Sequence, residues 1–154
     1  MKLRLEWGKP IALTDGSRLN LLYTFDHQKL PSSAGVYIFG RSFGRKFEAL
    51  YVGKAGSIRG RARGQLKNLP LMLHLSNAKI GKRILLSGRF VSKPGQKEEK
   101  CLKLLERALI RYFLSEGHDL VNKQGARLRR HEITSVEAKR RIPSLMFVDR
   151  AKGE

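Results

Sequence analysis

Two short runs of strand-forming residues, close together in the chain, constrain the fold more than any other feature. Residues 35–40 read Gly-Val-Tyr-Ile-Phe-Gly, and residues 49–53 read Ala-Leu-Tyr-Val-Gly. Both are rich in the β-branched and aromatic residues that strands favour, and a polar segment containing a glycine separates them. The pattern predicts a β-hairpin with Tyr37 on one strand and Tyr51 on the other. Two such tyrosines often do no more than pack across a strand pair.

Three further segments have clear periodicity or a recognisable boundary. Residues 57–69 fit a helix that begins at Ser57, a favourable N-cap residue. Residues 84–91 have the composition of a third strand. Residues 96–115 carry apolar side chains at helical spacing and predict the longest helix. From Val121 onward we expect mixed helix and loop.

The order of these segments predicts an α+β fold with a small mixed or antiparallel sheet of three strands flanked by helices. The 154 residues suit one compact domain. Within it we expect a core at about 29–122, an N-terminal extension over 1–28 and a basic C-terminal extension over 123–154.

The charge of the chain points to a polyanionic partner. Lys and Arg number 32 against 13 Asp and Glu, giving a formal net charge of +19. Nucleic acid and an anionic membrane surface both fit such a charge. The densest apolar run, at 69–75, is far shorter than the roughly 20 residues that cross a bilayer, so we expect no membrane partner. A single cysteine excludes an internal disulfide, and the first residues do not resemble a signal peptide, so we expect a cytoplasmic protein.

Two charged residues fall on or beside faces that should be buried. On a helical wheel, Arg61 lies with Gln65 at the edge of the apolar face of 57–69, whereas Arg59 and Arg63 point the other way. Glu106 falls inside the apolar arc of the long helix. A carboxylate there is costly unless a cation satisfies it, and that cation is either a side chain or a metal ion.

These features occur in one order along residues 29–122: Gly35-Val36-Tyr37, Tyr51-Val52-Gly53-Lys54, Arg61 ten positions after Tyr51, and Glu106 in a helix. In that order they resemble the GIY-YIG nuclease family. Each tripeptide alone arises by chance in many strands, but the ordered set is specific. The resemblance implies a GIY-YIG-like core and a divalent-metal-dependent endonuclease that hydrolyses DNA phosphodiester bonds.

The resemblance also implies a role for each residue. Glu106 would hold one Mg²⁺ or Mn²⁺ ion, and Arg61 would bind the scissile phosphate. One tyrosine would be the general base and the other would position phosphate or water. We favour Tyr37 as the base and Tyr51 as the positioner, although the reverse assignment is open. Lys54 would lower the pKa of either phenol, because a nearby cation favours the charged form.

Further residues are candidates for contacts with nucleic acid. Residues 41–67 carry eight Lys and Arg against one acid, and residues 123–141 carry seven against two. Such clusters hold phosphates without reading sequence. The candidates are Arg59, Arg63, Gln65, Asn122, Arg127, Arg129, Arg130 and His131. Gln65 stands where relatives often have a tyrosine or histidine, so the alternative function is a basic nucleic-acid-binding module without catalysis. One site handles one strand, so a double-strand cut would need a dimer or two successive nicks.

Overall fold

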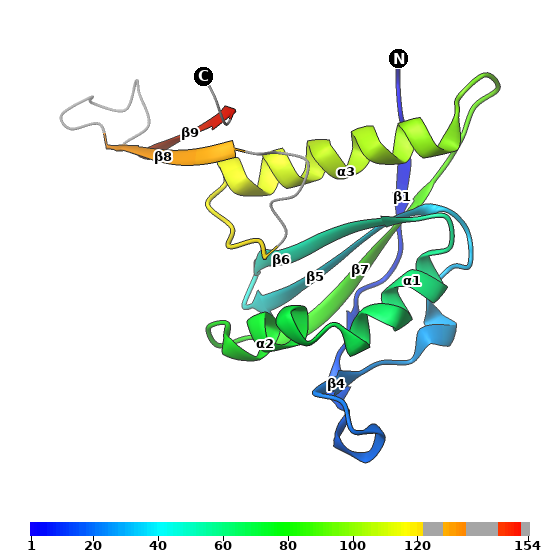
Figure 1. The fold of residues 1–154 in the computed structure, drawn as a ribbon, viewed down its shortest axis with the longest axis vertical. Helices are drawn as coiled ribbons and strands as arrows, with labels where there is room; N and C mark the ends of the chain where they lie inside the picture. Colours follow the sequence, from blue (N-terminus) through cyan, green and yellow to red (C-terminus); the bar gives the residue numbers. More distant parts are fainter. Residues whose placement is uncertain (122–127, 135–144, 152–154) are drawn as a thin grey trace.

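A five-stranded antiparallel sheet forms the centre of the protein (Figure 1). The computed structural model describes residues 1–121, 128–134 and 145–151, with side chains for 1–121. The strand order is β1-β7-β5-β6, and β2 pairs with β7 as well. These strands are β1 (Leu5–Trp7), β2 (Ile11–Ala12), β5 (Gly35–Phe43), β6 (Lys46–Ala55) and β7 (Lys82–Phe90).

The predicted hairpin is confirmed as β5 and β6. Its register pairs Tyr37 with Gly53 and Phe39 with Tyr51, and shifts by an irregularity just after Phe39. The strands are joined through Gly44, whose φ of 61° lies in the left-handed region that glycine adopts without strain. Because side chains alternate between the faces of a strand, Tyr37 and Phe39 lie on one face of the sheet.

The sheet has five strands where the sequence predicted three. Residues of the expected N-terminal extension supply β1 and β2, whose registers pair Leu5 with Phe90 and Ile11 with Leu85. Nine-residue β7 is longer than either partner, so the two short strands pair with it one after the other along its free edge. The same N-terminal residues form a separate ladder of β3 (Thr14–Asp15) and β4 (Tyr23–Thr24), and two 3₁₀ turns, η1 (Ser17–Leu19) and η2 (His27–Lys29).

The segment predicted as one helix over 57–69 is divided. Its parts are α1 (Ile58–Gly64), the 3₁₀ turn η3 (Gln65–Lys67) and, from its last residue onward, α2 (Leu69–Asn77). Ser57 is the N-cap of α1, as predicted, and its side chain accepts the N–H of Gly60. Asn68 begins a second helix by accepting the N–H of Leu71, and Pro70 at its start favours a new N-terminus rather than a continuous helix.

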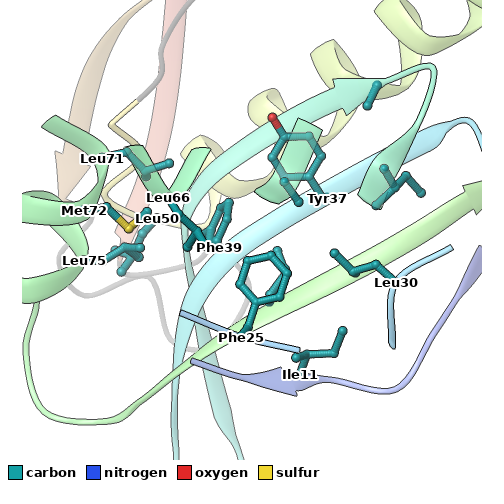
Figure 2. Packing of buried hydrophobic residues seen from close by; sticks show 14 residues of the cluster. Ile11, Phe25, Leu30, Tyr37, Phe39, Leu50, Leu66, Leu71, Met72 and Leu75 are labelled. Carbon is teal, nitrogen blue, oxygen red and sulfur yellow. The ribbon is translucent and has the colours of Figure 1, made fainter. Parts of the chain in front are cut away.

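Helices cover both faces of the sheet. Figure 1 shows α1 and α2 on one side and α3 (Glu98–Ser115), which confirms the predicted long helix, on the other. Figure 2 shows Tyr37 and Phe39 in the cluster on the α1 and α2 side. Ile38, between them in sequence, packs with Ile110 of α3 instead. No helix among the described residues has both the length and the apolarity needed to cross a bilayer.

The prediction of mixed helix and loop after Val121 is wrong for two segments. They are strands, β8 (Leu128–Thr134) and β9 (Leu145–Ala151), paired antiparallel with Leu128 opposite Ala151. The four apolar residues that begin β9 form a run that is too short to show helical periodicity and is typical of a strand.

Candidate active site

Both glycines of the two tyrosine motifs lie where no side chain fits. A Cβ on Gly35 would clash with the carbonyl oxygen of Gly88 on β7 and lie 2.7 Å from a methyl carbon of Ile58. A Cβ on Gly53 would lie 2.5 Å from the hydroxyl oxygen of Tyr37 and closer still to its ring. Gly35 therefore allows β5 to approach β7 and α1, and Gly53 leaves room for the Tyr37 ring to cross β6.

The two tyrosines and Gln65 form one hydrogen-bonded group. The rings of Tyr37 and Tyr51 are stacked, with centroids 6.0 Å apart. The side-chain amide of Gln65 donates to both hydroxyl oxygens, over 2.9 Å to Tyr37 and 3.0 Å to Tyr51. Its carbonyl oxygen accepts a 2.9 Å bond from the amide of Asn68, which fixes the orientation of the Gln65 amide. Gln65, at the end of α1, thus holds the ends of two side chains that come from two strands.

Burial separates the two tyrosines. Tyr37 is only 1% exposed, whereas Tyr51 is half-buried. Burial strongly raises the pKa of the Tyr37 phenol, and the neighbouring Tyr51 adds to this, while the hydrogen bond from Gln65 and the charge of Arg61 act in the opposite direction. A buried phenol with a raised pKa is a poor base at neutral pH. Of the two phenols, Tyr51 is therefore the more exposed to water, whereas the sequence favoured Tyr37 as the general base.

Arg61 is exposed beside this group. Its charge acts on Tyr37, and it lines a cavity of ≈ 540 Å³ together with Gln65 and the turn from Ala55 to Ser57. Within residues 1–121 no hydrogen bond or ion pair occupies its guanidinium. Its donors are therefore available to an anion that enters the cavity, next to Gln65. We name this space the Arg61 cavity.

Glu106 projects from α3 to the outer edge of the sheet. Its carboxyl group is half-buried, and this burial raises its pKa. The charge of Lys54 and a hydrogen bond with the Lys54 backbone lower that pKa in part. Among the described residues β6 is at the edge of the sheet, which leaves the Lys54 backbone accessible to this carboxylate. Glu106 thus meets β6 three residues beyond Tyr51.

Lys54 lies on the Glu106 side of the sheet and not on the side of Tyr37. It follows Val52 on the face that packs against α3, whereas Tyr37 lies on the opposite face. The cation that lowers the pKa of Tyr37 is Arg61, and the charge of Lys54 acts on Glu106. The sequence placed Lys54 correctly after the second strand motif but did not show which face of the sheet it would occupy.

The donor set around Glu106 suits only certain ions. No group of three or more His, Cys, Asp or Glu side chains gathers anywhere in the described part of the chain. Mg²⁺ is commonly held by one or two carboxylates, and substrate phosphate and water complete its shell. Glu106 supplies one such carboxylate. Its partial burial makes an uncompensated negative charge costly, and a bound cation would neutralise that charge.

The residues predicted to contact nucleic acid lie in different environments. Arg59 donates to the backbone carbonyls of Leu30 and Gln28, at 3.0 and 3.5 Å, so part of its guanidinium ties η2 to α1. Arg63 is exposed on α1. Asn122 and Arg127 lie outside the described residues, and the remaining candidates lie on β8 without described side chains: Arg129, Arg130 and His131.

Some of the positively charged side chains stabilise the fold. Arg41 is 7% exposed, pairs with Glu48 at 2.8 Å and stacks on Phe43, so it belongs to the hairpin rather than to a binding surface. Arg83 donates to the carbonyl of Leu75 in α2 and to three backbone carbonyls in the connection after that helix. Sequence reasoning also missed Asn68, which orients Gln65. The available signal was that asparagine is a favourable N-cap residue and that Asn68 lies two residues before Pro70.

Comparisons of the chain with protein-family models, with curated proteins and with solved structures found no match. The function is therefore inferred from the residues themselves. The arrangement brings the Gln65 amide and the Arg61 guanidinium to one cavity, joins that amide to the tyrosine pair, and places a half-buried carboxylate at the edge strand β6.

Proposed function

We propose that the protein is a divalent-metal-dependent endonuclease that hydrolyses DNA phosphodiester bonds through a GIY-YIG-like site. The observation that carries the proposal is the Arg61 guanidinium, which has no partner within residues 1–121 and lines one cavity with Gln65, the residue that binds both tyrosine hydroxyls. The net charge of +19 supports a polyanionic substrate. The two tyrosine motifs on paired strands β5 and β6 support the family resemblance.

In this proposal Arg61 binds the scissile phosphate. The planar fork of a guanidinium contacts two phosphate oxygens at once, which both orients the phosphate and offsets its charge. Charge increases on the phosphoryl oxygens as water attacks, so a cation fixed at that point stabilises the transition state more than the ground state.

Tyr51 takes the proton from the attacking water. A phenol serves as a general base only where nearby positive charge favours loss of its proton, and Arg61 and a bound metal ion would supply that charge. The half-buried position of Tyr51 allows contact with water, and the Gln65 amide fixes its hydroxyl group. Tyr37, buried beside it, positions Gln65 and Tyr51 rather than exchanging protons itself.

Glu106 holds the metal ion in this proposal. The bound ion would neutralise phosphoryl charge and stabilise the departing 3′ oxygen. The Lys54 backbone orients the carboxylate by its hydrogen bond. Hydrolysis that releases a 3′ oxygen leaves a 3′ hydroxyl and a 5′ phosphate, a product pair that can be tested.

A second candidate function is a nucleic-acid-binding module that does not cleave. The observation that favours it is Gln65, whose amide occupies both tyrosine hydroxyl oxygens. If both phenols were held only by this amide, neither would activate water. The same +19 charge would then serve binding alone.

A panel of substrates separates the two functions. Supercoiled plasmid, linear duplex, single-stranded and branched DNA would be incubated with the protein and Mg²⁺ or Mn²⁺, with EDTA as the control. The endonuclease proposal predicts metal-dependent cleavage of at least one substrate, with 5′ phosphate ends. A nicked plasmid as the first product indicates one strand per event, and a linear first product indicates paired sites. Binding to every substrate without cleavage of any would refute the proposal and support the binding module.

A further inference from the structure

A second cavity lies beside α1, between that helix and the N-terminal residues. Its volume is ≈ 520 Å³, within the range of small-molecule sites in proteins. Apolar and basic side chains line it: Leu19, Leu21, Phe25, Leu66, Arg63 and Lys67. Within residues 1–121, no acidic side chain lines it. We name it the N-terminal cavity.

The lining of the N-terminal cavity suits an unpaired nucleotide. Phe25 and Leu66 are each 7% exposed and belong to the core, so they offer a firm apolar wall (Figure 2 shows Phe25). Bases removed from a duplex are bound by such apolar and aromatic surfaces. Arg63 and Lys67 are exposed at the cavity, and side chains of this kind form charge-assisted hydrogen bonds with phosphates. An acidic peptide or a free anion would leave the apolar wall unused.

The wall on the N-terminal side is held in place. The guanidinium of Arg59 donates to the carbonyls of Leu30 and Gln28, and the Arg59 backbone N–H donates to the carbonyl of Pro31 at 3.0 Å. These bonds fix the chain just after His27, which also lines the cavity. The cavity is therefore built by contacts between α1 and the N-terminal residues.

Two glycines of α1 connect the N-terminal cavity with the Arg61 cavity. Gly60 and Gly64 line both. A Cβ on Gly64 would meet no atom within 4 Å, and a Cβ on Gly60 would meet only Ser57, at 3.6 Å or more. Packing thus does not require glycine at either position, and in a helix each glycine costs roughly 1 kcal/mol relative to alanine. Because neither glycine has a side chain, the α1 backbone forms only a low ridge between the two cavities.

We propose that the N-terminal cavity takes one unpaired base of the substrate strand, next to the phosphate held by Arg61. The substrate would then be DNA with an unpaired nucleotide, single-stranded or branched, because a base within intact duplex is stacked and paired and cannot enter. The inference depends on one part of the proposed function, namely that the substrate is a nucleic acid. It does not require that the site cleaves that substrate.

Equilibrium binding of labelled DNA to the full chain, without metal, tests this inference. Three probes of equal length are compared at one salt concentration: duplex, duplex with one unpaired nucleotide, and the same duplex with an abasic unpaired position. We expect about tenfold tighter binding of the probe with the unpaired base than of the other two, the size of one buried base contact. Equal affinities for the unpaired base and the abasic position would overturn the inference.

Gly64→Leu provides a matched variant. Its side chain would project into open space, and leucine is a better helix former than glycine, so the variant should melt at or above the temperature of the unchanged protein. Because Gly64 also lines the Arg61 cavity, the readout is the ratio of the two affinities: we expect the variant to lose the preference for the unpaired base over the abasic position, whatever its affinity for duplex. A retained preference would place the base elsewhere and overturn the inference. Base-dependent binding without any cleavage refutes only the endonuclease, and cleavage without base dependence refutes only the base site.

Discussion

Gly53→Ala is the substitution whose effect follows most directly from the geometry. The added Cβ would lie 2.5 Å from the Tyr37 hydroxyl oxygen and 2.8 Å from Cε1, where ordinary contact begins at 3.4 Å. The Tyr37 ring cannot swing outward, because it is 1% exposed and packs edge-on to Phe39 and stacked on Tyr51. A shift large enough to relieve the clash would break the 2.9 Å bond to Gln65.

The expected loss of stability combines two costs. Overpacking a tight core costs roughly 1–3 kcal/mol, and a lost buried hydrogen bond costs about 1 kcal/mol more. The total of about 2–4 kcal/mol corresponds to a fall in melting temperature of roughly 4–16 °C for a chain of this size. Thermal unfolding followed by circular dichroism measures it. Gly56→Ala is the control, because its Cβ would meet only a Glu98 oxygen at 3.9 Å.

A double-mutant cycle ties this loss to Tyr37 itself. In Gly53→Ala combined with Tyr37→Leu, the shorter side chain does not reach the added methyl group, so the double variant should lose less stability than the two single variants together. The difference should be about 1–3 kcal/mol. Additive losses, or a Gly53→Ala protein that melts with the Gly56→Ala control, would show that the ring does not lie across Gly53.

Two further predictions concern ionisable groups of the site. Tyr51→Phe should abolish cleavage, whereas Tyr37→Phe should retain a measurable rate, because Tyr51 is half-exposed to water and Tyr37 is buried. Single-turnover cleavage rates at saturating protein measure both effects. Equal losses of rate in the two variants would contradict the assignment of Tyr51 as the base. Burial raises the pKa of Glu106 above its ordinary 4.5, so the folded chain binds the Glu106 proton more tightly than the unfolded chain does. The bound proton stabilises the fold at low pH, and this stabilisation is lost as the pH rises through the raised pKa. The gain in melting temperature of Glu106→Gln over the unchanged protein in EDTA should therefore be larger at about pH 7.5 than at about pH 4, and a gain independent of pH would contradict the burial.

Elements whose pattern is local could be predicted from the sequence. The β5 and β6 hairpin and α3 follow from residue composition and helical spacing within one continuous segment. Pairing of β1 and β2 with β7 was not predictable in this way, because Leu5 and Phe90 are far apart in the chain and a short alternating run does not reveal its partner. The break before α2 depends on Asn68 and Pro70 as a new helix start, a local signal that apolar spacing alone hid.

The sequence predicted which residues form the candidate site better than it predicted how those residues contact one another. Arg61 at the edge of an apolar helix face does lie beside Tyr37, and the half-burial of Glu106 agrees with its place in the apolar arc of α3. The difference in burial between Tyr37 and Tyr51 depends on which neighbours cover each strand, and spacing does not contain that information. The bonds from Gln65 to both hydroxyl groups likewise depend on how α1 packs on the sheet.

The most direct test of the central claim is the cleavage rate of Glu106→Gln measured beside its affinity for the same DNA. Glu99→Gln is the matched control, because Glu99 lies in the first turn of the same helix with a side chain 87% exposed. The endonuclease proposal predicts that Glu106→Gln binds DNA as Glu99→Gln does but cleaves at least about a hundredfold more slowly with Mg²⁺, the usual size of losing one group that stabilises a transition-state charge. Equal cleavage rates for the two variants would contradict it.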